Sequence, residues 1–164
     1  MKKTIVAAAG LLVLCASAFA WSQDAQKQIV GTWRLVSESN TKDGVTKKGT
    51  AFGDNPKGML MFTSDGHYSS VNTRGDLPVF TSGNRMQGTA DENKAIVHGS
   101  IAHYGTYKVS ADGKKLMLTP ESGTWPTWNG KEQTRGLDIK GDELTYTVNA
   151  SIGGTGELVY RRVR

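Results

Sequence analysis

Hydrophobic and polar residues alternate in short runs along most of this chain, and tight-turn dipeptides separate the runs. The turn dipeptides are Asp43-Gly44, Asp65-Gly66, Asp112-Gly113, Gly141-Asp142 and, as a further candidate, Asn129-Gly130. Such dipeptides tolerate the positive φ angles that tight β-turns require. Because a hydrophobic period of two is typical of half-buried strands, the pattern predicts a chain that repeatedly folds back on itself as an antiparallel sheet.

The runs predict strands at residues 32–39, 59–63, 67–74, 101–110, 115–119, 132–140, 143–150 and 157–163. Thr89 and Glu92 have the spacing of a capping box, which predicts one short helix from Ala90 to about His98. Residues 120–130 are expected to form a loop or a distorted edge. An up-and-down sheet of about eight strands closes into a barrel that can hold one small ligand. The expected fold is therefore an all-β, antiparallel barrel with one short helix.

The first 20 residues have the pattern of a signal peptide. Lys2 and Lys3 form a charged start, a short apolar stretch follows, and Ala18-Phe19-Ala20 is a small-x-small cleavage site. We expect a signal peptide at 1–20, a single barrel domain at 21–164, and a secreted, periplasmic location. The alternative is a lipoprotein anchored through Cys15, although the residue before such a cysteine is normally small and Leu14 is not.

Charge and cysteine content exclude several classes of function. Removal of Lys2 and Lys3 lowers the net charge from +5 to +3, and charges of both signs are scattered along the chain. The pattern therefore predicts no nucleic-acid partner, and no integral membrane segment in the mature chain. With Cys15 removed there is no cysteine left for a disulfide, so stability must come from a packed core, which a chain of this length can bury in one domain.

Gly31-Thr32-Trp33 resembles the Gly-x-Trp signature that opens the first strand of lipocalins. A longer pattern is similar to that of the bacterial and fungal lipocalin-like domain family and spans nearly all of the mature chain. The matching segments are Gly31 to Val36, Pro56 to Gly66, Tyr104 to Tyr107, Trp128 to Gln133 leading to Arg135, and Leu158 to Val163. The resemblance implies a calycin-type β-barrel with a helix after Thr89, and it implies no particular activity.

The alternation within residues 132–140 places Gln133 and Arg135 on the same face as Leu137 and Ile139. If the two aliphatic side chains point into the barrel, the guanidinium of Arg135 does so too. An enclosed guanidinium needs an anion or several hydrogen-bond acceptors. We therefore expect Arg135 to bind a carboxylate or enolate of a ligand. The alternatives are an internal salt bridge or a position near the open mouth of the barrel.

Three tyrosines and one histidine fall on predicted inward faces of other strands. An aromatic ring with a polar tip suits a ligand pocket, but core packing is the alternative for each tyrosine taken alone. The expected ligand-binding residues are Arg135, Gln133, Tyr107, Tyr68, Tyr146 and His103.

The resemblance to lipocalins gives Trp33 a structural role. In lipocalins the first-strand tryptophan packs at the closed end of the barrel, and an arginine near the last strand lies across its ring. Arg161 or Arg162 is placed to make this cation–π contact here.

No metal site, cofactor or catalytic residue is predicted. The chain contains three histidines, His67, His98 and His103, without a His-x-His or His-Glu-x-x-His pattern. Axial binding of haem by a single histidine is kept as an alternative on geometric grounds. Nucleophile-elbow and phosphate-loop motifs are absent from the sequence.

These features together favour an exported lipocalin-like protein that binds a small, largely apolar or weakly acidic molecule in the barrel cavity. One alternative is an isomerase- or cyclase-type enzyme, in which Arg135 stabilises an oxyanion and Tyr107 or His103 moves a proton. Another is a structural envelope protein whose barrel is filled by its own side chains. The sequence favours a binding protein over an enzyme and does not specify an oligomeric state.

Overall fold

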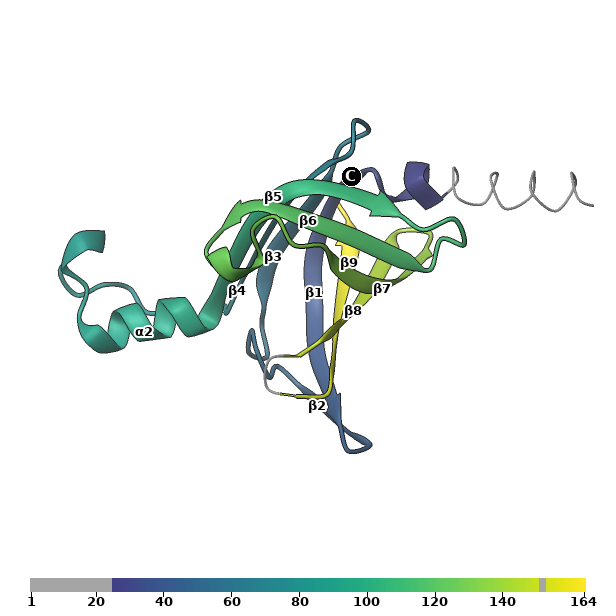
Figure 1. Ribbon diagram of the computed structural model, residues 1–164. Helices are drawn as coiled ribbons and strands as arrows, with labels where there is room; N and C mark the ends of the chain where they lie inside the picture. The colour runs from purple at the N-terminus through teal and green to yellow at the C-terminus, as the bar shows by residue number, and fades with distance from the viewer. Residues whose placement is uncertain (1–24, 151–152) are drawn as a thin grey trace, which may run out of the picture.

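The strands follow one another around a single antiparallel sheet (Figure 1). The computed structural model describes residues 25–150 and 153–164, and the predicted signal peptide at 1–20 lies outside them. The strands are β1 (Gly31–Lys42), β2 (Val45–Lys48), β3 (Lys57–Phe62), β4 (His67–Thr73), β5 (Ser100–Val109), β6 (Lys115–Gly123), β7 (Gln133–Lys140), β8 (Glu143–Asn149) and β9 (Thr155–Arg162). Each predicted strand is present, so the predicted all-β fold is confirmed.

The sheet closes into a barrel because β1 pairs with β3 at its start and with β9 along most of its length. The pairs with β3 run from Gly31 to Arg34, and the pairs with β9 run from Trp33 to Thr41. A bulge between Leu35 and Ser37 bends β1 at the place where it leaves β3. The short β2 pairs with the end of β1 and stands outside the closed ring.

One end of the barrel is closed by the helical residues 25–29. Ile29 and Trp33 are fully buried there, and Nε1 of Trp33 donates a hydrogen bond to the carbonyl oxygen of Ile29 (2.8 Å). The guanidinium carbon of Arg162 lies 4.0 Å from the centre of the Trp33 ring, and its Nη1 donates to the carbonyl oxygen of Val30 (2.8 Å). Arg161 is exposed on the outer face of β9. The floor of the barrel is therefore a packed layer.

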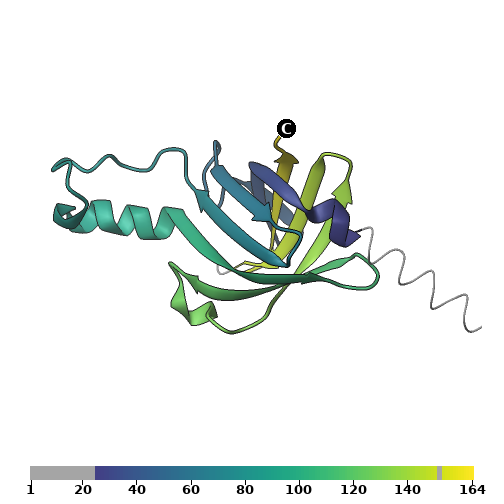
Figure 2. The ribbon, with the colours of Figure 1, turned by 90° about the horizontal axis from the view of Figure 1, so that it is seen from above.

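Residues 74–99 form an arm that stands away from the barrel (Figures 1 and 2). The arm contains a short 3₁₀ helix, η1 (Arg85–Gln87), and the helix α2 (Ala90–Gly99), which runs directly into β5. The predicted capping box is present: Thr89 Oγ1 accepts from Glu92 N–H (3.2 Å), and the Glu92 carboxylate accepts from Thr89 N–H (2.7 Å). Within the described chain, no helix is long and apolar enough to cross a membrane.

Residues 120–130, expected to form a loop or a distorted edge, begin as an edge strand and continue as a loop. β6 continues to Gly123 and pairs with β5 to its end, and the loop proper holds a second 3₁₀ helix, η2 (Pro126–Trp128). β7 pairs with β6 only as far as Leu118, so Pro120 lies where β6 has become an edge strand. A proline is accepted at an edge because its missing N–H has no partner to lose. The expected distorted edge is therefore present at residues 120–123, and the expected loop follows it.

Candidate functional site

The inner face of β4 is polar. Tyr68, Ser70 and Asn72 alternate with outward-facing residues and are 3%, 1% and 1% exposed. Buried polar side chains cost free energy unless they form hydrogen bonds. The middle of the barrel therefore contains groups that need partners.

A chain of hydrogen bonds crosses the barrel from β4. The Tyr160 hydroxyl on β9 donates to Oδ1 of Asn72 (3.1 Å) and lies 3.2 Å from the Tyr146 hydroxyl on β8. Burial raises the pKa of both tyrosines above its usual value, so both phenols stay protonated. The alternation of inward and outward positions along the strands did not single out Tyr160 or Asn72, because it does not show which side chains form hydrogen bonds with one another across the barrel.

The second polar contact joins β4 to β5. The Tyr68 hydroxyl lies 2.8 Å from Nδ1 of His103. Burial, and secondarily the charge of Arg135, lower the pKa of His103 to about 4. Burial raises the pKa of Tyr68. Both groups are therefore neutral at neutral pH, and the imidazole can accept the Tyr68 proton in a hydrogen bond.

Arg135 points into this polar layer from β7. Arg135 pairs with Leu116 of β6, and Gly136 pairs with both β6 and β8, without a register shift, so the regular alternation holds at this position. Burial lowers the pKa of Arg135, and the phenols of Tyr146 and Tyr68 partly oppose that shift. Nη1 donates to the carbonyl oxygen of Thr134 (3.2 Å). Among the described residues, no Asp or Glu forms an ion pair with this guanidinium.

Trp128 of η2 lies beside both Arg135 and His103. The guanidinium carbon of Arg135 is 5.6 Å from the centre of the Trp128 ring, and the His103 ring meets the same indole edge-on at 5.6 Å. The indole thus forms an apolar and cation-tolerant wall for the site. Sequence reasoning treated Trp128 as a loop residue, although it stands at the start of the Trp128-to-Gln133 segment of the family pattern.

Two buried side-chain oxygen atoms in the described chain lack a hydrogen-bond partner, Oγ of Ser70 and Oδ1 of Asn40. Ser70 is the direct cross-strand partner of His103, so its hydroxyl lies at the same level of the barrel. A buried hydroxyl without a partner costs about 1–3 kcal/mol. An occupant of the site that offers a polar atom to Ser70 would recover this free energy.

Of the six predicted ligand-binding residues, the structure brings four together and places the other two elsewhere. Tyr68, Tyr146, His103 and Arg135 come together in the polar layer, as the hydrogen bonds and pKa shifts above describe. Tyr107 lies toward the closed end, where its hydroxyl donates to the carbonyl oxygen of Thr63 (2.9 Å) and its ring meets Phe62 at 4.7 Å. The side chain of Gln133 turns back to the carbonyl oxygen of Lys131 (3.2 Å) at the start of β7.

Within the described residues, no cluster of three or more His, Cys, Asp or Glu side chains is arranged to hold a metal ion.

Comparison with known proteins places this barrel in a family. The family model described as a lipocalin-like domain matches residues 30–161. The chain therefore belongs to the family of lipocalin-like domains. No curated protein matches it.

Solved structures show a distant likeness. A lipocalin-like protein from Bacteroides uniformis is 14% identical, with 83% of this chain and 99% of that chain covered and a TM-score of 0.46. A Schistosoma mansoni fatty acid binding protein in complex with arachidonic acid is 12% identical, with coverages of 85% and 99% and a TM-score of 0.40. A single-site mutant of the fluorescent protein UnaG is 18% identical, with coverages of 84% and 97% and a TM-score of 0.40.

Proposed function

We propose that this protein binds a small, largely apolar molecule with a weakly acidic group inside the barrel. The observation that carries the proposal is the inward guanidinium of Arg135, which has no carboxylate partner among the described residues. A partly desolvated cation is costly, and a ligand carboxylate or enolate would offset that cost.

The surroundings of Arg135 suit an anion with an apolar body. His103 and the tyrosines are neutral and add no competing negative charge. The Ser70 hydroxyl has no hydrogen-bond partner and is available to a second oxygen atom of the ligand. Leu118 and Leu137, both buried, provide apolar contacts on the neighbouring strands β6 and β7. Arg135 would therefore orient the acidic group, while the aliphatic side chains hold the apolar part.

The test compares two probes that differ in charge, dodecanoate and dodecanol, in isothermal titration calorimetry. Charged hydrogen bonds contribute about 1.5–3 kcal/mol, and about 1.4 kcal/mol is a factor of ten in affinity. Arg135→Met should therefore weaken dodecanoate binding by at least about tenfold and change dodecanol binding little. Arg161→Met removes an exposed arginine from β9 and serves as the matched control. Equal dodecanoate affinities in wild type and Arg135→Met would contradict the proposal.

An enzymatic role is the second candidate, and the Tyr68–His103 hydrogen bond beside Arg135 is the observation that favours it. A neutral imidazole can take up a proton while a guanidinium stabilises an oxyanion, which is the chemistry of an isomerase or cyclase. The partner in this pair is Tyr68, since Tyr107 lies toward the closed end of the barrel.

Molecules that co-purify from the native host distinguish the two roles. If the protein is a carrier, wild type and His103→Gln should co-purify with the same molecule, as judged by its mass and chromatographic retention. An enzyme would instead leave an unconverted isomer on His103→Gln that wild-type protein does not retain.

We also propose that binding takes place outside the cytoplasm, in the periplasm, after cleavage before Trp21. The charged start, the short apolar stretch and the Ala18-Phe19-Ala20 site support this location. Intact-mass measurement of the exported protein should give a chain that begins at Trp21. A mass that includes a lipid-modified Cys15 would instead identify a lipoprotein.

A further inference from the structure

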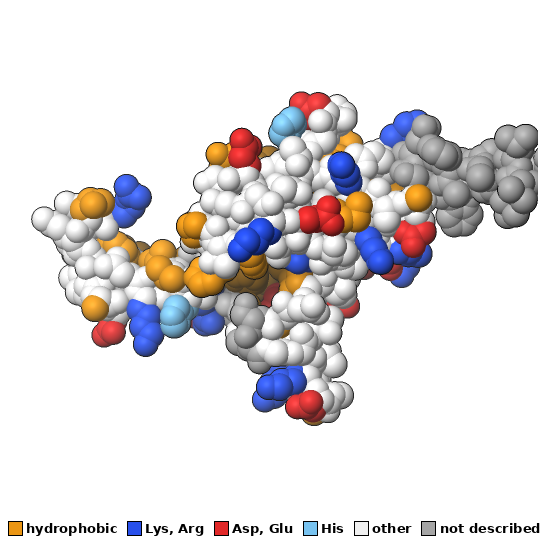
Figure 3. Space-filling view, viewed as in Figure 1, with side chains coloured by type: hydrophobic (Ala, Val, Ile, Leu, Met, Phe, Trp, Pro, Cys, Tyr) orange, Lys and Arg blue, Asp and Glu red, His pale blue; other side chains and the backbone are white. Residues whose placement is uncertain are grey.

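The arm carries a loop, residues 77–88, that presents apolar side chains to solvent. Val79 is 90% exposed and Met86 is 81% exposed. Val79 and Phe80 also line, together with Ile96 of α2, a hollow of about 310 Å³ between this loop and the helix. Figure 3 shows that apolar side chains gather along one edge of the arm. A projecting element with this much apolar surface is typical of an interaction site.

This apolar loop contains one charged residue, Arg85, and no acid. Arg85 lines the same hollow as Val79 and Phe80, so a cation lies directly beside the apolar side chains. Its guanidinium forms no ion pair with any residue that the structure describes. The apolar loop therefore suits a partner that offers an apolar phase next to negative charge.

The other charges of the arm agree with an anionic partner. Asp76 is engaged in a salt bridge with Arg74. Of the exposed charged residues of the arm without an ion pair in the described chain, Arg85 and Lys94 are cations and Asp91 is the one acid. The whole chain has a formal net charge of +5, which stays positive without Lys2 and Lys3. An anionic surface would therefore attract both the arm and the protein as a whole.

Hydrogen bonds hold the apolar loop in shape. Gly83 N–H donates to the carbonyl oxygen of Phe80 (2.9 Å), which closes a tight turn. The Glu92 carboxylate of α2 accepts from the N–H and the hydroxyl of Thr81 (2.8 and 2.9 Å), so the loop is tied to the helix. Backbone polar groups that are already engaged cost less free energy to move into an apolar phase.

We propose that the arm docks this protein on an anionic phospholipid bilayer, with Val79, Phe80 and Met86 inserted among the headgroups and Arg85 at the phosphates. Interfacial binding of this kind combines buried apolar area with attraction between cations and anionic lipids. A fluid bilayer needs no matching shape, so a projecting loop is sufficient. The proposal is independent of the barrel ligand, because the apolar loop contributes no side chain to the polar layer.

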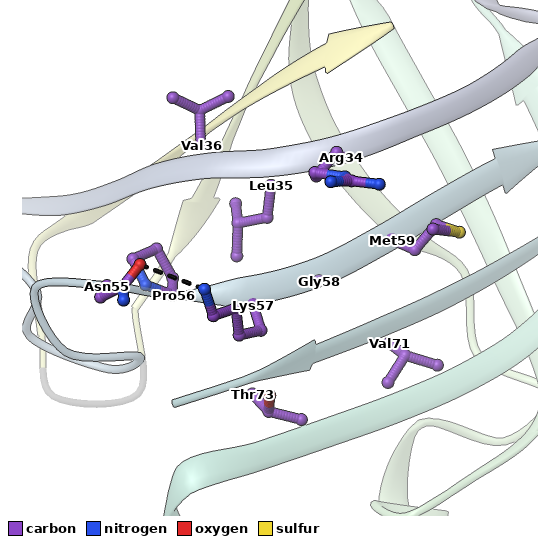
Figure 4. Close-up of a pocket in the computed structure, with 10 residues that line it drawn as sticks. All are labelled: Arg34, Leu35, Val36, Asn55, Pro56, Lys57, Gly58, Met59, Val71 and Thr73. Carbon is purple, nitrogen blue, oxygen red and sulfur yellow. Dashed lines mark hydrogen bonds between the residues drawn. The ribbon is translucent and has the colours of Figure 1, made fainter. Parts of the chain in front are cut away.

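Another hollow of the described surface has a similar charge but a different shape. It is a groove of about 460 Å³, which forms where β1 and β3 separate beyond the Arg34–Met59 pair (Figure 4). Arg34 and Lys57 line it without an acid, and Leu35 lies buried at its base. The groove is recessed in the barrel wall, whereas the arm stands away from the barrel (Figure 2). The arm is therefore the element that can enter a bilayer.

Co-sedimentation of the exported chain with lipid vesicles tests the proposal. The mixed vesicles contain equal parts of phosphatidylglycerol and phosphatidylcholine, and the neutral vesicles contain phosphatidylcholine alone. Wild type should sediment with the mixed vesicles and much less with the neutral ones. Val79→Asp should lower the partition coefficient on mixed vesicles by at least about tenfold, because it replaces an inserted apolar side chain with a charge. Arg85→Gln should lower it by about fivefold on mixed vesicles and change it little on neutral ones.

Two matched variants serve as controls. Val45→Asp and Val36→Asp introduce the same charge at exposed valines of β2 and of the groove, and both should bind like wild type. All variants share one N-terminus, so differences between them report on the substituted site. Wild-type protein that stays in the supernatant with mixed vesicles would overturn the proposal. Equal effects of Val79→Asp and either control would do the same, as would a dimer without vesicles that Val79→Asp dissociates, because its occupant is a second copy.

A fluorescent label measures insertion of the arm directly. Cys15 is the one cysteine of the sequence, so an exported chain that begins at Trp21 has no competing site for a thiol-reactive label. The nitrobenzoxadiazole label on Met86→Cys should brighten and shift to shorter wavelength on mixed vesicles. The same label on Val45→Cys should keep its emission in water. Emission from Met86→Cys that stays unchanged while the protein is bound to vesicles would contradict insertion of the arm.

Discussion

At the scale of single residues, the floor of the barrel depends on Trp33. Its ring is fully buried, its N–H is satisfied by Ile29, and Arg162 covers its face. Arg162 is in turn held by the carbonyl oxygen of Val30, so the tryptophan joins β1, β9 and the N-terminal helical turn. Such a residue supports the scaffold and lies away from the polar layer where a ligand would bind.

Trp33→Ala should therefore destabilise the protein without altering its ligand preference. Truncation of a buried large aromatic side chain costs about 3–5 kcal/mol. Urea denaturation should show a loss of this size. Trp125→Ala is a matched control, since Trp125 is 52% exposed, and its loss should be small. Equal losses for the two variants would contradict the structural role of Trp33.

The buried imidazole of His103 makes stability depend on pH. Its pKa falls from 6.5 to about 4 in the folded protein, so the unfolded chain takes up a proton first as the pH decreases. Stability is therefore full above pH 6.5 and is lost as the pH falls from 6.5 toward 4. One pKa unit corresponds to about 1.4 kcal/mol, which limits the loss to roughly 3 kcal/mol.

His103→Gln should flatten the dependence of the urea midpoint on pH between 6.5 and 4.5. Glu92, whose pKa is lowered to about 2, loses its contribution only below its unfolded value of 4.5, so it does not overlap this range. A folded-state titration of His103 by NMR near 6.5 would contradict the burial of its ring in solution.

Strand parity predicted which residues face inward and could not predict how deep they lie. The alternation of inward and outward positions is a local property, so Arg135, Tyr68, Tyr146 and His103 were identified correctly as inward-facing. Their height in the barrel depends on strand stagger, which is set by non-local pairing. For that reason sequence reasoning grouped Tyr107 with them, although it lies toward the floor.

At the scale of elements, the capping box at Thr89 shows how well a local motif can specify structure. The spacing of Thr89 and Glu92 predicted a helix from Ala90 to about His98, and α2 runs from Ala90 to Gly99. The direction in which α2 points was not predictable. Ile96 and Val97 are adjacent in sequence and do not form a stripe along one face, so the pattern does not indicate a packing partner.

Removal of the cap should affect the arm alone. Loss of an N-cap costs about 1 kcal/mol. Thr89→Ala should therefore increase the rate of amide exchange in α2 several-fold and leave the rate of exchange in the barrel strands unchanged. Hydrogen-exchange mass spectrometry resolves the two regions. Thr106→Ala, at an exposed threonine of β5, serves as the control. Faster exchange throughout the barrel would show that the arm and the barrel unfold as one unit.

At the scale of the whole molecule, the family pattern and the number of strands predicted the barrel, and the arm was the main surprise. Barrel closure follows from alternating strands joined by tight turns, which are visible in sequence. Whether residues 74–99 would cover the barrel mouth or leave it depends on contacts between distant parts of the chain. The solvent exposure of Val79 and Met86 could therefore not be predicted from the sequence and is evident only from the position of the arm.

The pairing of β1 with β9 also sets the order in which the protein can assemble. Trp33 pairs with Arg162, so the seam joins residues from opposite ends of the chain. During synthesis or export, the early strands expose an open edge until the final segment emerges, and open edges favour aggregation. A truncation that removed only β9 would not leave a smaller barrel. It would leave two unpaired edges in every molecule, each able to hydrogen-bond to an edge of its neighbour.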